Sequence, residues 1–209
     1  MRMLRLAGAL GPLVFAAAVL VAAALRPDYS HVTSFISELG ANGTANAALM
    51  NYAGFVPGGL LLAAFGVALA GALPKRRTTL AAAALVTLFG CGVAASGFIS
   101  CDAGCPQAGG SIENAIHNAI APIAFLSLIA GAATLGLCFR RLADWRAFSL
   151  YSLLTSAFAL CFLAALAGSL DTRELTGLWQ RLLLAVLFLW CAVIGVHAFQ
   201  LSRRSHAGD

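Results

Sequence analysis

The stretch LAGALGPLVFAAAVLVAAAL, residues 6–25, runs for twenty residues without a charged side chain. A helix of about 20 apolar residues is long enough to cross the hydrocarbon core of a bilayer. Five further runs of similar length and composition follow along the chain. The six predicted spans are Leu6–Leu25, Asn51–Leu73, Leu80–Ser100, Ala119–Phe139, Ala147–Leu170 and Leu178–Leu201. We therefore expect an all-α, polytopic membrane protein, folded as a single six-helix transmembrane bundle over residues 1–209.

The overall composition supports the same fold class. Of the 209 residues, 61% are hydrophobic and only 10% are charged, and the mean hydropathy is +0.90. Soluble domains carry about 25% charged residues, so a soluble fold is excluded. The apolar runs lack alternating polarity and are about twice as long as a transmembrane strand, which also excludes a β-barrel.

The basic residues predict how the chain is oriented in the membrane. They stand in short groups between the spans, and the resulting loops alternate between basic and nearly free of basic residues. The set on one side is Arg2, Arg5, Lys75, Arg76, Arg77, Arg140, Arg141, Arg146, Arg203 and Arg204. Because short cytoplasmic loops are enriched in Lys and Arg, we expect this side, with both termini, to be cytoplasmic. The charges are dispersed rather than clustered, so the net charge of +5 does not indicate a nucleic-acid partner.

The first span could also be interpreted as a signal peptide, since two arginines precede it and small residues end it. Its apolar run is about 20 residues long, whereas the core of a signal peptide has roughly 7–15. We therefore expect a retained helix.

The first outer loop contains SHVTSFISELG, residues 30–40, which is unusually polar for this chain. At 100° per residue, Val32, Phe35, Ile36 and Leu39 share one face of a helix. The polar candidates on or near the opposite face are His31, Ser34, Ser37 and Glu38. We expect a short amphipathic helix on the outer membrane surface, begun by Asp28 or Ser30 and ended by Gly40. Its polar face would either meet water or line a site.

The second and third outer loops add further candidates. In the second loop Asp102 lies in a tight turn, and Ser111 is a candidate cap for the fourth span. Glu113 and His117 then lie four residues apart on one helix face, with Asn118 near the mouth of the bundle. The third loop and the start of the sixth span contribute Asp171, Arg173, Gln180 and Arg181. Arg181 would reach toward lipid headgroups, pair with an outer carboxylate or bind a phosphate.

Cys101 and Cys105 are the two cysteines outside the spans, and we expect them to form a disulfide. The alternative is thiolate ligation of a metal together with His31 or His117. CDAGC is not a strong zinc spacing, and neither HxxxH nor HExxH occurs, so we predict no metal and no cofactor. His197 and His206 lie at the opposite end of the chain's last span and cannot join this cluster.

Four stretches in this order resemble the membrane-protein family called Domain of Unknown Function 998. They are residues 26–59, which include ISELG, residues 97–106, which include CDAGC, the His117–Asn118 pair, and GLWQR at residues 177–181. The resemblance implies a bacterial or archaeal cell-membrane protein with about six helices and no assigned activity. The ISELG stretch is also distantly similar to the start of the Frag1/DRAM/Sfk1 group, some of which act in lipid remodelling.

Three functions remain open at this point. The first is an enzyme that modifies a lipid at the outer leaflet, with His31 or His117 as the base and Ser34 or Ser37 as the nucleophile. Glu38 and Asp102 would orient the histidine, and Asn118, Asp171, Gln180 and Arg181 would bind the substrate. The second is a protein that binds or transports a lipid or small molecule. The third is a structural accessory subunit. Membrane lipids are the expected partners in the first two functions, and the sequence specifies no protein partner.

Overall fold

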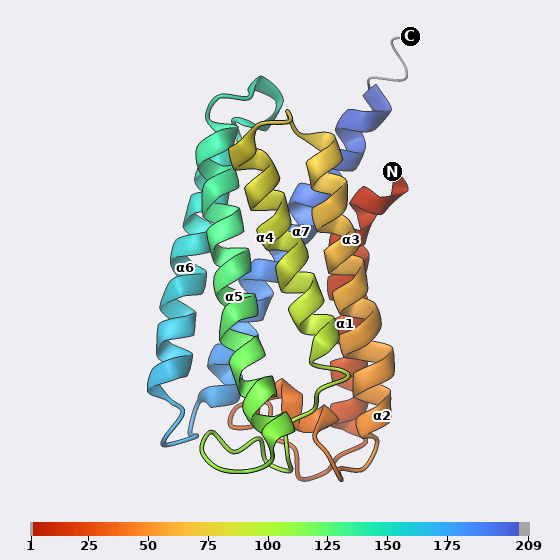
Figure 1. Cartoon of the computed structure of the whole chain (residues 1–209), viewed down its shortest axis with the longest axis vertical. Helices are drawn as coiled ribbons and strands as arrows, with labels where there is room; N and C mark the ends of the chain where they lie inside the picture. Colours follow the sequence, from red (N-terminus) through yellow and green to blue (C-terminus); the bar gives the residue numbers. More distant parts are fainter. Residues whose placement is uncertain (1, 205–209) are drawn as a thin grey trace.

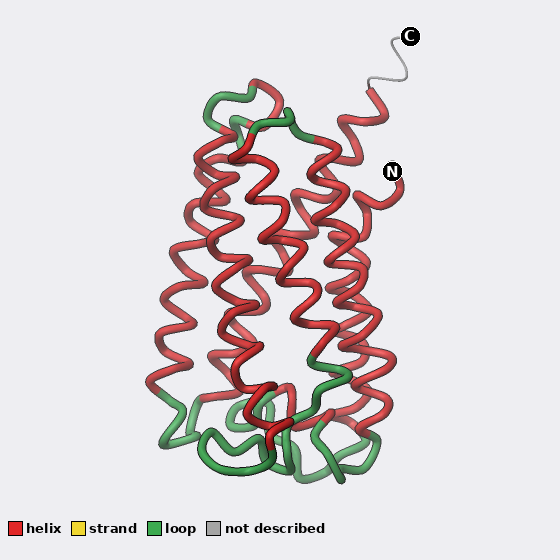
Figure 2. The backbone as a smooth tube through the Cα atoms, viewed as in Figure 1, coloured by secondary structure: helices red, strands yellow, loops and turns green. Residues whose placement is uncertain are grey.

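The computed structural model describes residues 2–204, so His206 lies outside the described residues. Six long helices run along one axis of the molecule (Figure 1), and no strand occurs within the described range (Figure 2). All six are long and apolar enough to cross a membrane, which confirms the predicted fold class. The main helices are α1 (Ala7–Ala24), α3 (Val56–Ala72), α4 (Arg77–Ala95), α5 (Ile112–Phe139), α6 (Phe148–Gly168) and α7 (Thr176–Arg204).

The helices form a closed ring. Each one packs against its neighbours in the chain, and α7 returns to pack against α1. Phenylalanines fill the interior, where Phe15 of α1 lies 5.3 Å, between ring centroids, from both Phe55 and Phe188. Large apolar side chains such as Leu160 and Leu189 remain more than half exposed on the outer faces. An apolar exterior around an apolar interior is what a bilayer requires of a helix bundle.

The second span contains an irregular turn. It starts with α2 (Ala47–Leu49), continues as the π-helical turn η3 (Met50–Phe55) and becomes regular in α3. The buried Asn51 amide in this turn donates to the carbonyl of Gly40 (3.0 Å) and to Ser100 Oγ (3.1 Å), both in loops at the end of the bundle opposite the termini. Pro57 lies in the first turn of α3, directly after the π-helical turn, and has no N–H to donate to that preceding turn.

The two ends of the bundle differ. One end, called the terminal end below, holds the first and last described residues, Arg2 and Arg204, and two short connections, residues 73–76 and 140–147 (Figure 1). The other end, here the loop end, holds loop 1 (residues 25–46), loop 2 (residues 96–111) and loop 3 (residues 169–175). The fourth predicted span, α5, begins at Ile112 rather than Ala119, and the predicted cap Ser111 accepts the N–H of Asn114 at its Oγ (3.1 Å).

The structure corrects the expected amphipathic helix in loop 1. Residues 31–34 form turns, Phe35 is extended, and only η2 (Ile36–Gly40) is helical, as a short 3₁₀ helix. Glu38 Oε1 accepts the N–H of Phe35 (2.9 Å), which fixes this break. The prediction of which side chains are buried is wrong at two positions: Val32 is exposed and Glu38 is buried.

The closest helix contact is between α3 and α4, and it depends on Gly59 and Gly90. A Cβ atom on Gly59 would overlap the backbone of Ala94, and one on Gly90 would overlap the backbone of Ala63. Small residues allow helices in a membrane to approach closely and to gain van der Waals contact.

We predict that Gly90→Leu lowers the free energy of unfolding by about 1–3 kcal/mol, the usual cost of overpacking. Thermal unfolding in detergent measures the change. Gly168→Leu is the matched control, since nothing lies within 4 Å of the added Cβ there. Equal stability of both variants and the wild type would contradict this account of the contact.

Candidate functional site

Loop 1 is bound to the start of α7 by two side chains that the sequence predicted to bind substrate. The Arg181 guanidinium donates to the carbonyl of Ser34 (3.1 Å), to His31 Nδ1 (3.2 Å) and to the Tyr29 hydroxyl. Gln180 Oε1 accepts the N–H of Ile36 (2.8 Å). Both residues therefore lie beside the predicted polar residues of loop 1. The Arg181 guanidinium and Gln180 Oε1 use their hydrogen bonds to hold this loop.

His31 is held in one tautomer. Because Nδ1 accepts a hydrogen bond from Arg181, the proton of the neutral ring is on Nε2. Desolvation, followed by the nearby Arg181 charge, lowers the pKa of His31 below its usual value. Neither Glu38 nor Asp102 contacts this ring. In this arrangement His31 has no free lone pair with which to act as a base.

Glu38 pairs with Arg173 of loop 3, at 2.7 Å between Oε1 and Nη2. The same guanidinium donates to the carbonyl of Gly104 in loop 2 (2.9 Å) and lies 4.3 Å above the ring of Phe35. One arginine therefore connects all three loops. Nothing in the sequence identified this partner of Arg173, since the two residues are 135 positions apart.

Asp102 folds loop 2 back onto the start of α5. Its carboxylate accepts the N–H of Ser111 (2.6 Å) and the hydroxyl of Ser111 (2.8 Å), and these bonds lower its pKa. Its own N–H donates to the side-chain oxygen of Asn114 (3.2 Å). Asp171, by contrast, is exposed in loop 3, away from any hydrogen-bond partner in the described chain. The expected convergence of Asp102 with a histidine is not formed.

Cys101 and Cys105 form the predicted disulfide, with their Cα atoms 5.1 Å apart. The bond lies against loop 1, where the Cys101 carbonyl accepts the N–H of Asn42 (2.8 Å) and Cys105 Sγ is 3.4 Å from Ser37 Oγ. Disulfide sulfurs are not thiolates, so the alternative of thiolate ligation does not apply to this pair. Within residues 2–204, no group of three His, Cys, Asp or Glu side chains could hold a metal ion.

His117, in the first turns of α5, is the predicted histidine that keeps a free acceptor. Its Nδ1 donates to the carbonyl of Ile99 (2.6 Å), so Nδ1 carries the proton. The ring is buried, and Nε2 has no hydrogen-bond partner within the described part of the chain. A backbone carbonyl, rather than a carboxylate, therefore fixes the tautomer and leaves a lone pair on Nε2.

His117 lines a cavity of about 270 Å³ at the loop end, between loop 1, loop 2 and helices α5, α6 and α7. One part of its lining is polar but uncharged: Ser37, Gln107, His117, Asn118 and Gln180. The other part is apolar and comes mainly from α5 and α6: Ala121, Pro122, Phe125, Leu163, Leu166, Ala167 and Leu170. Such a lining suits a molecule with a neutral polar head and an apolar tail.

A smaller cavity of about 60 Å³ adjoins the first one, and Ser37, His117 and Gln180 line both. Its remaining lining is apolar except for Ser96 at the end of α4, and it includes Phe15, Phe55, Phe89 and Phe125. The polar lining thus stops at the phenylalanine cluster in the bundle interior.

Comparison with known proteins gives one result. The family described as Protein of unknown function (DUF998) matches residues 9–197. The chain belongs to the DUF998 family. No curated protein and no solved structure matches it. The matched range contains the whole cavity lining and the three loops. The six membrane-spanning helices make this DUF998 member an integral membrane protein, and the family description gives no activity.

The Glu38–Arg173 pair gives a test of how the loops are held. We predict that Arg173→Met lowers the free energy of unfolding by about 2 kcal/mol, because it leaves a buried carboxylate without its cation. The effect is smaller than for a fully buried pair, since 32% of the Arg173 side chain is exposed. Thermal unfolding of the purified protein measures it, with Arg204→Met as the exposed control.

The double variant Glu38→Gln/Arg173→Met completes the cycle. We expect it to be more stable than the sum of the two single changes indicates. Simple additivity would show that the ion pair does not couple the two loops.

Proposed function

We propose that this DUF998 protein binds a membrane lipid with an uncharged, hydroxyl-bearing head in the cavity beside His117. The observation that supports this most directly is the free Nε2 acceptor of His117 in a cavity lined by both uncharged polar and apolar side chains. A lipid hydroxyl would donate to Nε2, and the Gln180 amide N–H group would donate to a carbonyl of the same head. The acyl chain would lie along Leu163 and Leu166.

The charge distribution favours a neutral head over a phosphate. The cavity lining contains no Lys, Arg, Asp or Glu. Arg181, the candidate phosphate ligand, faces a different groove and donates to loop 1 instead. A phosphate in the cavity would lose its hydration without gaining a cation, which is strongly unfavourable.

Binding is better supported than the two alternatives. Nucleophilic catalysis by Ser37 needs a hydrogen bond to its base, and no such bond joins Ser37 to His117 in residues 2–204. The two carboxylates expected to orient the histidine, Glu38 and Asp102, are bonded to Arg173 and Ser111. For transport, a polar path through the bundle is required, whereas the polar lining ends at Phe89 and Phe125.

A fluorescent diacylglycerol added to the protein in neutral detergent tests the proposal. We expect His117→Ala to weaken binding about tenfold, because one hydrogen bond to a buried acceptor is lost. Leu163→Trp should abolish binding by filling the apolar part. Leu160→Trp, on the lipid-facing side of the same helix, is the matched control and should bind like the wild type.

Thermal midpoints of the three variants separate loss of binding from loss of folding. Undiminished binding by both cavity variants would refute the assignment. Release of a fatty acid during the assay, stopped by Ser37→Ala, would instead establish a hydrolase.

We also propose that the loop end faces away from the cytoplasm. The terminal end carries ten basic residues of the thirteen, and the loop end carries Arg26, Arg173 and Arg181 together with the disulfide. This asymmetry is the usual sign of a cytoplasmic terminal end.

Reporter fusions test this orientation. Alkaline phosphatase, which is active only after export, should be inactive when fused after Arg204 and active when inserted in loop 3 after Thr172. The opposite pattern of activity would reverse the assignment.

A further inference from the structure

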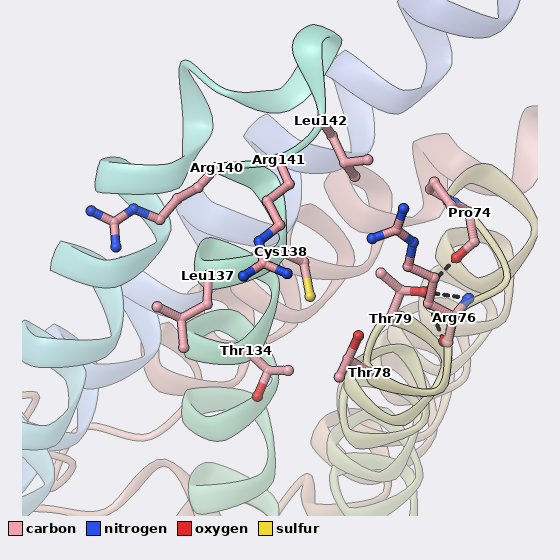
Figure 3. A pocket seen from close by; sticks show the side chains of 10 residues that line it. All are labelled: Pro74, Arg76, Thr78, Thr79, Thr134, Leu137, Cys138, Arg140, Arg141 and Leu142. Atoms are coloured by element: carbon pink, nitrogen blue, oxygen red, sulfur yellow. Dashed lines mark hydrogen bonds between the residues drawn. The ribbon is translucent and has the colours of Figure 1, made fainter.

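A second hollow, of about 600 Å³, lies at the terminal end between α4 and α5 (Figure 3). Its arginines come from two connections that are far apart in sequence, Arg76 before α4 and Arg141 after α5. The two guanidinium groups point into the hollow from opposite sides, whereas Arg140 turns away toward α6 (Figure 3). This hollow is separate from the cavity beside His117, which lies at the other end of the bundle.

The two facing cations have no anionic partner in the described chain. The ion pair described above, Glu38 with Arg173, is at the loop end. No acidic side chain lines the hollow, and no side-chain hydrogen bond from Arg76 or Arg141 occurs within residues 2–204. Two like charges that face each other repel, and an anion between them would remove this cost.

The remaining lining indicates what kind of anion fits. The hydroxyls of Thr78 and Thr134 are available as donors, while the hydroxyl of Thr79 is already bonded to the carbonyls of Pro74 and Arg76. Leu137, 55% exposed, supplies an apolar wall on α5 below Arg141, whereas Leu142 lies above it (Figure 3). Guanidinium groups bind phosphate oxygens in a bidentate manner, and the apolar wall suits an acyl chain.

The depth of the hollow also fits a lipid. It lies where α4 begins and α5 ends, which would place its arginines at the level of the headgroups and Leu137, within α5, at the level of the chains. Basic pockets between spans are a recognised way of binding the headgroups of anionic lipids. We propose that Arg76 and Arg141 bind the phosphate of an anionic phospholipid in this hollow.

The test uses phosphatidylglycerol, with purified full-length protein in neutral detergent. Native mass spectrometry counts the bound lipid during a titration. We expect Arg76→Gln/Arg141→Gln to weaken binding roughly 30-fold, as the loss of two basic contacts near a headgroup implies. The same double variant should unfold without lipid at a temperature equal to or above that of the wild type, because it relieves a repulsion.

The matched control is Arg203→Gln/Arg204→Gln, which removes the same charge from the same end but outside the hollow. It should keep wild-type affinity. Equal losses in the two double variants would overturn the site in favour of general surface charge. Equal affinity for phosphatidylcholine would also overturn it, since that lipid carries no net charge.

Two soluble probes distinguish a lipid from a free phosphate. Glycerol 3-phosphate and inorganic phosphate should fail to displace phosphatidylglycerol, since they lack the chains that would contact Leu137. Displacement by either one at a comparable concentration would overturn the lipid assignment and indicate a soluble anion.

Discussion

The structure depends on one constraint, that loop 1 enters the end of an apolar bundle and must still satisfy its polar groups. Phe35, Ile36 and Leu39 are buried there, and fully burying such a side chain is worth about 1.5–3 kcal/mol. The same insertion buries the Glu38 carboxylate, which would be very costly without a cation. Arg173 supplies that cation and extends the contact to loop 2. Arg181, Gln180 and Asn51 bond to three backbone groups of the segment, and Tyr29 and Arg26 donate to two further carbonyls, so an irregular chain is tolerated at the membrane surface.

The cavity is a consequence of this arrangement. Loop 1 covers the end of the bundle and contributes Phe35 and Ser37 to the lining, and the disulfide of loop 2 holds Cys105 against Ser37. The charged side chains of the three loops bond to other groups or are exposed to solvent. The polar lining of the cavity therefore consists of neutral amides, one hydroxyl and one imidazole. The resulting site is suited to recognising a hydroxyl rather than an anion, and the phenylalanines below it close the path into the bundle.

The arginines at the two ends of the molecule differ in whether they have partners within the protein. At the loop end, arginines are matched with a carboxylate, carbonyls and a tyrosine, and they hold protein segments together. At the terminal end, Arg76 and Arg141 face each other without an acidic partner in the described range. The first arrangement stabilises the fold, whereas the second leaves two exposed cations without a partner in the described chain. A protein that binds a neutral lipid at one surface and an anionic lipid at the other would contact both leaflets of its membrane.

The sequence by itself determined the six spans, the all-helical fold class, the disulfide and the family, because span length, charge and cysteine position are local properties of the chain. It also identified His117 and Ser37 as residues of interest. It failed at the faces of residues 30–40, since the Glu38 carboxylate breaks the helix by bonding to Phe35 N–H and is buried against a residue 135 positions away. Only the tertiary structure decided that Arg181 and Asp102 hold loops while His117 keeps a free acceptor. Those roles depend on which carbonyls and carboxylates the folded loops bring near, and no spacing along the chain specifies that.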